Sequence, residues 1–145
     1  MRTKQEFRST RETVGMTQAF LARELSVEVR SVKRWESPDA PQFPPQDAWD
    51  VLDNALSLQR QVISFSLGKV DDIAQQQGNY PASVKLPYWS SQEEYECYHC
   101  VSDEGDFRAA NANLRLVAFA LHERDIKVEW AAGKDLPTAQ VLGSD

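Results

Sequence analysis

The sequence predicts a mainly α fold. Residues 16–36, MTQAFLARELSVEVRSVKRWE, carry apolar side chains at the spacing of two short helices joined by a tight turn. Residues 46–77 contain no proline and a single glycine, which favours one long helix. Alternating apolar residues near 84–88 and 126–130 predict short strands. Together these patterns predict an N-terminal helix-turn-helix bundle, a long connecting helix and a small α+β C-terminal unit with two short strands.

The two short helices carry local signals at their ends. Thr17 is placed to cap the first helix, because its hydroxyl can accept a backbone N–H that has no partner in the helix. Ser26 falls at the turn, where a residue tolerant of unusual backbone angles is needed. In the second helix Val32 and Trp35 are expected to face inward. The outer side is left with Arg30, Ser31, Lys33 and Arg34.

This arrangement is typical of a helix that enters the major groove of DNA. We expect Arg30 and Arg34 to contact bases, since guanine O6 and N7 are the natural acceptors for arginine. Ser31 and Lys33 could reach bases or phosphates. The alternative for Arg34 is an ion pair close to Glu36 or with Asp39.

The segment resembles the Cro/CI-type (XRE) helix-turn-helix family over about residues 4–55. The resemblance rests on GMTQ, on Leu21–Ala22, on Trp35–Glu36 and on Arg11, seven residues before Gln18. Two residues depart from the family pattern, Ser26 in place of a turn glycine and Phe20 in place of a capping-box Glu.

The resemblance has implications for three side chains. Arg11 is expected to pair with Glu36 and so to lock the first helix of the domain to the end of the recognition helix. Gln18 is expected to contact a phosphate and to brace the recognition helix.

More loosely, the whole chain resembles XRE-type autorepressors with a C-terminal extension, such as those found beside anti-CRISPR genes. That likeness rests on VEVRSVKRWES, an acidic amphipathic helix, a short strand and a helix like LRLVAFALHE.

Charge is divided unevenly along the chain. The 145 residues carry a net charge of −6, but residues 1–36 hold eight Lys/Arg against five Asp/Glu. The remaining residues hold eight against seventeen. The basic residues therefore lie with the proposed DNA-reading helix, although ordinary solvated surface charge would give the same count. The acidic remainder should limit nonspecific binding to DNA.

The N-terminus lacks the apolar stretch of a signal peptide, and no segment approaches the roughly 18 apolar residues of a membrane span. The expected protein is soluble and cytoplasmic, with no membrane contact.

The long helix is expected to begin after a loop that contains four prolines between residues 38 and 45. Its apolar residues form two neighbouring stripes, and Gln59 and Ser66 interrupt the first of them. We expect the first turns to complete the N-terminal core, and the later turns to pack on the C-terminal region or on a second subunit. The alternative is a single helix inside a monomer core.

The C-terminal half is expected to contain a strand, two helices and a second strand. Val84, Leu86 and Tyr88 should share one face of the first strand, and Pro87 predicts that this strand lies at an edge. The helices are expected to start at a capping box formed by Ser91 and Glu94 and at residue 107. The predicted domains are residues 1–58 for DNA binding, 59–132 for dimerisation or interaction, and 133–145 as a tail.

Chemical sites are weakly indicated. Cys97 and Cys100, with His99 between them, form half of a zinc motif, so core packing is the favoured interpretation over a metal or redox pair. The carboxylates of Glu93, Glu94 and Glu96 indicate a solvated helix face. No nucleophile, phosphate-loop or zinc-protease motif is present, and we expect no enzyme activity, no cofactor and no metal.

The sequence thus predicts a dimeric, sequence-specific DNA-binding regulator, most simply a repressor that reads an inverted-repeat operator. The expected partners are double-stranded DNA and a second copy of the chain. The dimer is expected to form after about residue 58, through apolar residues that include Val62, Phe65, Val70 and Ile73. The alternative is an antitoxin or another interaction module, whose C-terminal region binds a protein partner while its DNA-binding domain represses its own operon.

Overall fold

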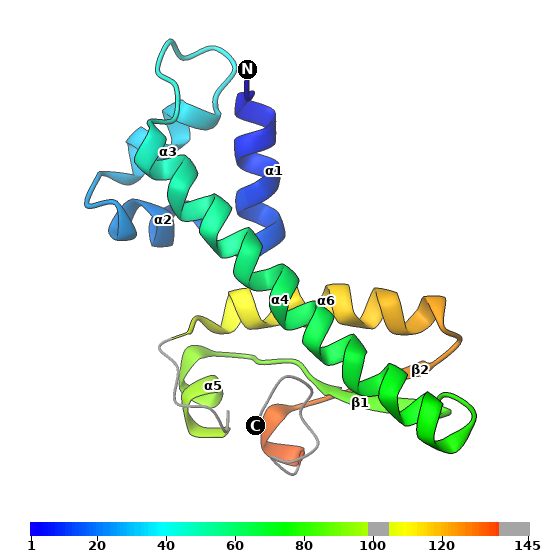
Figure 1. Cartoon of the computed structure of the whole chain (residues 1–145). Helices are drawn as coiled ribbons and strands as arrows, with labels where there is room; N and C mark the ends of the chain where they lie inside the picture. Colours follow the sequence, from blue (N-terminus) through cyan, green and yellow to red (C-terminus); the bar gives the residue numbers. More distant parts are fainter. Residues whose placement is uncertain (99–104, 137–145) are drawn as a thin grey trace. The chain divides into compact units, whose positions relative to one another are not determined.

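The computed structural model describes residues 1–98 and 105–136. The chain divides into two compact units, Met1–Gln59 and Arg60–Asp145. Both units are built largely from helices, and a two-stranded sheet lies in the second (Figure 1). The predicted mainly α fold with a small strand-containing C-terminal unit is therefore confirmed.

The first unit contains α1 (Lys4–Val14), α2 (Gln18–Glu24), α3 (Val29–Glu36) and the first turns of α4 (Gln46–Gln77). Thr17 caps α2 as predicted, because its hydroxyl accepts the Phe20 N–H at 3.0 Å. The turn before α3 places Ser26 at a φ of 55°, the left-handed conformation that the sequence led us to expect there. Local chemistry therefore sets the start of α2 and the turn between α2 and α3.

Aromatic rings fill the core of the first unit. Phe7 is fully buried, and its ring meets those of Trp35 and Trp49 edge-on, with centroids 6.2 and 5.1 Å away. Leu21 and Val32 are fully buried beside them. Trp49 belongs to the first turn of α4, so the start of the long helix completes this core, as predicted.

The long helix follows the predicted bounds, and one of its polar interruptions has a structural role. The side chain of Gln59 is buried, and its amide donates a hydrogen bond to the Thr13 carbonyl at 2.8 Å. This bond satisfies a carbonyl near the end of α1 that has no partner within the helix. Helix α4 ends at Gln77, and the next residue, Gly78, has a φ of 85°.

The second unit consists of the later turns of α4 followed by β1 (Ser83–Pro87), α5 (Gln92–Tyr98), α6 (Phe107–Glu123), β2 (Lys127–Ala131) and the 3-10 turn η1 (Gly133–Asp135). The strands pair in parallel, with Val84 beside Val128 and Leu86 beside Trp130. Parallel strands need a long connection, which α5 and α6 provide. The core contains Val70, Leu86, Trp89, Tyr95, Leu114, Val117, Ala118, Leu121 and Ile126.

A buried asparagine joins α6 to the segment after β1. The Trp89 N–H donates to Asn111 Oδ1 at 2.9 Å, and Asn111 Nδ2 donates to the Trp89 carbonyl at 2.8 Å. The two bonds satisfy both backbone groups of Trp89 where its ring is buried.

Several side chains lie elsewhere than predicted. Tyr88 does not share a face of β1 with Val84 and Leu86, because the strand ends at Pro87; Tyr88 is exposed, and the next residue, Trp89, is buried. Val70 is 1% exposed in the core of the second unit, so it cannot contribute to a surface between subunits. Cys97 is exposed rather than packed in the core, while His99 and Cys100 lie outside the described residues.

The segment predicted as a tail begins in an ordered turn. Gly133 is buried, and a Cβ atom at this position would overlap the ring of Trp89. Residues 137–145 lie outside the described part of the chain.

We predict opposite effects for two glycine substitutions. Gly133→Ala should lower the free energy of unfolding by about 1–3 kcal/mol, because the added methyl group meets the Trp89 ring. Gly68→Ala should raise it by about 0.5–1 kcal/mol, because Gly68 lies within α4 with open space around it. Urea titrations of the two variants measure both values. Equal stability of both variants would contradict the packing at Gly133.

Candidate nucleic-acid interface

Helix α3 is held by one face and leaves the other to solvent. Val32 is fully buried and Trp35 is 8% exposed, which fixes the helix against the core of the first unit. Arg30, Lys33 and Arg34 are exposed, and Ser31 is partly exposed. The four residues of α3 that are predicted to contact DNA therefore share the part of this helix that is not used for packing.

The exposed basic side chains differ in their pairing. Arg30 forms an ion pair with Glu28, but both side chains are more than two thirds exposed, so solvent screens the pair strongly. Across residues 1–98 and 105–136, no ion pair is formed by Lys33 or Arg34. The alternative of a pair between Arg34 and Asp39 is thus not seen in that part of the chain.

Arg11 and Glu36 form a two-pronged ion pair between α1 and the last residue of α3. Arg11 Nε donates to Glu36 Oε2 at 2.6 Å, and Arg11 Nη2 donates to Oε1 at 2.8 Å. The two side chains are only 9% and 5% exposed. The pairing implied by the family resemblance is present, in the parallel fork geometry that arginine and carboxylate form best.

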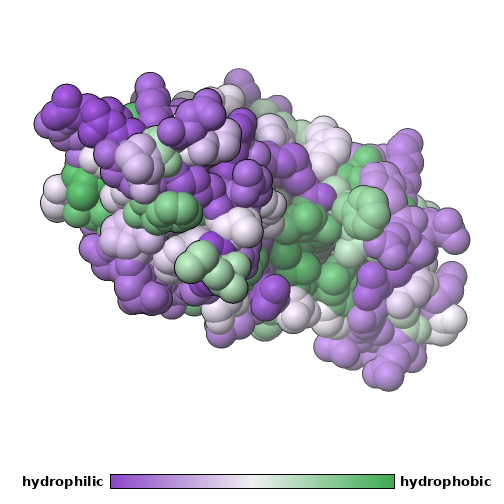
Figure 2. All heavy atoms as spheres, turned by 90° about the horizontal axis from the view of Figure 1, so that it is seen from above, coloured by the Kyte–Doolittle hydropathy of each residue, from purple (hydrophilic) through white to green (hydrophobic). Residues whose placement is uncertain are grey.

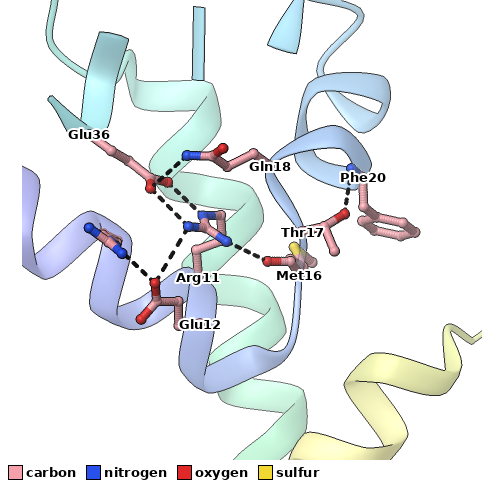
Figure 3. A network of polar contacts seen from close by, with 8 residues as sticks. Arg11, Glu12, Met16, Thr17, Gln18, Phe20 and Glu36 are labelled. Carbon is pink, nitrogen blue, oxygen red and sulfur yellow. Dashed lines mark hydrogen bonds and ion pairs between the residues drawn. The ribbon is translucent and has the colours of Figure 1, made fainter. Parts of the chain in front are cut away.

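Two further bonds tie the same pair to α2. Arg11 Nη1 donates to the Met16 carbonyl at 2.8 Å, just before α2, and Gln18 Nε2 donates to Glu36 Oε1 at 3.1 Å (Figure 3). Gln18 therefore braces the end of α3, as the resemblance implies. We call Arg11, Met16, Gln18 and Glu36 the brace.

A shallow groove lies beside the brace on the surface of the first unit. Glu12 accepts a hydrogen bond from Arg8 at 2.9 Å, which lowers the pKa of Glu12 and raises that of Arg8. Both groups are exposed, so the pair leaves them accessible to other charges. The groove is lined by Arg8, Arg11, Thr17, Gln18, Lys33, Glu36, Ser37 and Pro38.

Lys4 helps to hold the end of α3 in place, and the sequence did not predict this role. Its ammonium group is buried and donates to the carbonyls of Arg34, Ser37 and Ala40 at 3.1, 2.7 and 2.7 Å. All of its donors are therefore satisfied where α3 ends and the proline-rich loop begins. A lysine in the first turn of a helix opposes the helix dipole, and this mismatch was the available signal that Lys4 has another role.

The exposed surface of the second unit includes large apolar side chains. Val62 and Phe65 on α4 are 40% and 49% exposed, and Leu116 and Phe119 on α6 are 39% and 66% exposed. Ile73 is 37% exposed. The space-filling view shows apolar side chains exposed among hydrophilic ones (Figure 2). Of the apolar residues expected at a subunit surface, Val62, Phe65 and Ile73 are accessible.

Residues 1–98 and 105–136 contain no group of three or more His, Cys, Asp or Glu placed to hold a metal ion. None of the helices in these ranges is long and apolar enough to cross a membrane.

Comparison with known proteins adds no assignment. A scan against protein-family models found no matching family, and a search of curated proteins found no relative.

We predict that the brace is a main source of stability in the first unit. Arg11→Met should lower the free energy of unfolding by about 3–5 kcal/mol, because it leaves the buried Glu36 carboxylate without its partner. The control is Arg2→Met, which removes a similarly two-pronged pair with Asp53 whose side chains are 39% and 45% exposed. That change should cost at most about 1 kcal/mol. Chemical denaturation followed by circular dichroism compares the two, and equal losses would contradict the burial argument.

Proposed function

We propose that this chain is a sequence-specific DNA-binding transcriptional regulator, acting in the cytoplasm as a dimeric repressor. The observation that carries the proposal is the division of α3 into two faces. One face is fixed by Val32, Trp35 and the brace, and the other presents Arg30, Ser31, Lys33 and Arg34. A rigid helix with exposed basic side chains after a short helix and a turn suits the major groove.

The chemistry of the side chains supports separate roles. Arg30 and Arg34 have the fork of donors that matches guanine O6 and N7, so they would read bases. Lys33 and Ser31 would contact bases or phosphates. Gln18 would contact a phosphate while it holds Glu36, which would set the position of the helix on the duplex.

The brace suits this role because base readout needs side chains held in fixed positions. Discrimination between base pairs depends on two parallel hydrogen bonds from one arginine, and these tolerate little displacement of the helix. The brace joins α1, the start of α2 and the end of α3. Lys4 adds a tie to the residues just beyond α3.

A dimer would supply a second recognition helix, which would contact the second half-site of the operator. Recognition helices of this type act in pairs on half-sites about one helical turn, or roughly 34 Å, apart. The exposed apolar residues of the second unit support its role in holding two copies together, since large apolar side chains in groups mark contact surfaces.

Base readout is tested with alanine variants of α3. After an operator is selected from random duplex DNA, Arg30→Ala and Arg34→Ala should each weaken binding by about 1–3 kcal/mol and relax the preference at one defined base pair. The control is Arg108→Ala, an exposed arginine on α6 that carries the same charge change. Fluorescence anisotropy at fixed salt measures the affinities. Losses no larger than that of Arg108→Ala would rule out base contacts by α3.

The role of the second unit is tested by truncation. A fragment of residues 1–59 keeps Gln59 and the whole core of the first unit, so it should fold. We expect it to be monomeric and to bind a two-half-site operator far more weakly than the full chain does. Sedimentation and gel-shift titration give both results. An affinity equal to that of the full chain would show that the second unit has no part in DNA recognition.

A further inference from the structure

The two strands of the second unit present very different outer edges. Lys127 N–H donates to the Ala82 carbonyl at 3.1 Å, and Tyr88 N–H donates to the Ala131 carbonyl at 2.9 Å. Successive peptide groups of a strand point to opposite sides. The backbone groups of Val128 and Trp130 therefore point away from β1, and those of Ser83, Lys85 and Pro87 point away from β2.

The outer edge of β1 is poorly suited to further pairing. Pro87 has no N–H to donate, and Lys85 places a charged side chain on this strand. Proline and lysine are both features that prevent an edge strand from pairing with a further strand. The outer edge of β2 has no proline. Within residues 1–98 and 105–136, no hydrogen bond to the outward backbone groups of Val128 or Trp130 is found.

The charges on β2 are arranged so that the strand is complementary to itself. Lys127 and Glu129 flank Val128 on the face opposite to it, with side chains 75% and 40% exposed. In an antiparallel pair centred on Val128, Lys127 lies opposite Glu129 of the partner subunit, and Glu129 lies opposite Lys127 of the partner subunit. Opposite charges that face each other across antiparallel strands stabilise the pairing.

The apolar side of β2 suits the same register. Val128 would lie opposite the partner's Val128. Trp130 is 45% exposed and lies on the same face as Val128, whereas the partner's Ile126 stays in its own core at 1% exposure and adds no contact. A register centred on Glu129 instead would place two carboxylates directly against each other, which disfavours it.

We propose that β2 pairs in antiparallel fashion with β2 of a second copy of this chain, about a two-fold axis at Val128. The pairing would convert each two-stranded sheet into half of a four-stranded sheet, β1-β2-β2-β1. The contact uses the same patch on both copies, as a two-fold dimer requires. This inference deepens the dimer part of the proposed function and does not depend on DNA binding.

Charge reversal in the full-length chain tests the pairing. Glu129→Lys would place two lysines opposite each other at both ends of the pair, and Lys127→Glu would do the same with two carboxylates. Each single variant should dimerise at least about tenfold more weakly than the wild type, because two attractive contacts become repulsive. Glu123→Lys, an equal charge reversal at the exposed end of α6, is the matched control and should dimerise as the wild type does.

Mixing the variants separates pairing from misfolding. An equimolar mixture of Glu129→Lys and Lys127→Glu restores opposite charges at both positions, so it should form dimers at a concentration where each variant alone is monomeric. The double variant K127E/E129K should dimerise with itself. Sedimentation velocity measures all of these states, and circular dichroism checks that each variant is folded.

Three results would overturn the proposal: a monomeric wild type at tens of micromolar, single variants that dimerise as tightly as the wild type, or a mixture that stays monomeric. DNA selection is scored separately on the same proteins. A wild type that pairs through β2 but selects no DNA sequence would refute the proposed function and leave this interface standing. Selective DNA binding by a protein that dimerises through another surface would refute the β2 interface and leave the proposed function standing.

Discussion

The buried ion pair of Arg11 with Glu36 is the interaction on which the arrangement of the first unit depends. It lies where α1, the start of α2 and the end of α3 meet, and each of these segments contributes a bond to it. Burying the two charges is costly, but the fork geometry and the bonds from Gln18 and to Met16 offset that cost. Apolar packing of Val32 and Trp35 gives α3 its place, and the ion pair fixes its angle.

The positively charged side chains of the first unit include both buried and exposed groups. Within the first unit, the positive groups with structural roles, Arg11 and Lys4, are buried and fully paired. Lys33 and Arg34 have no ion-pair partner in the described ranges and stay on the surface of α3. The protein thus uses the same residue types for two purposes, and burial separates the two.

Local signals were enough to predict α2, α3 and the bounds of α4. Thr17 and Ser26 act on neighbours in sequence, and helical spacing placed Trp35 inward, but its partner Phe7 lies far away in sequence. Lys4 binds carbonyls thirty or more residues away, and nothing near it in sequence indicates that contact. The parallel pairing of β1 with β2 and the bonds between Trp89 and Asn111 likewise join residues that are far apart in sequence. The DNA-binding roles remain proposals drawn from exposure and chemistry.

The central claim is that the outer face of α3 contacts DNA, and amide chemical-shift mapping tests it most directly. The full-length chain, labelled with nitrogen-15, is titrated with its selected duplex and then with a scrambled duplex of equal length. We predict that the largest sequence-dependent shifts fall at residues 28–36 and at Gln18, while α6 changes little. Shifts concentrated in the second unit, or identical shifts with both duplexes, would contradict the account.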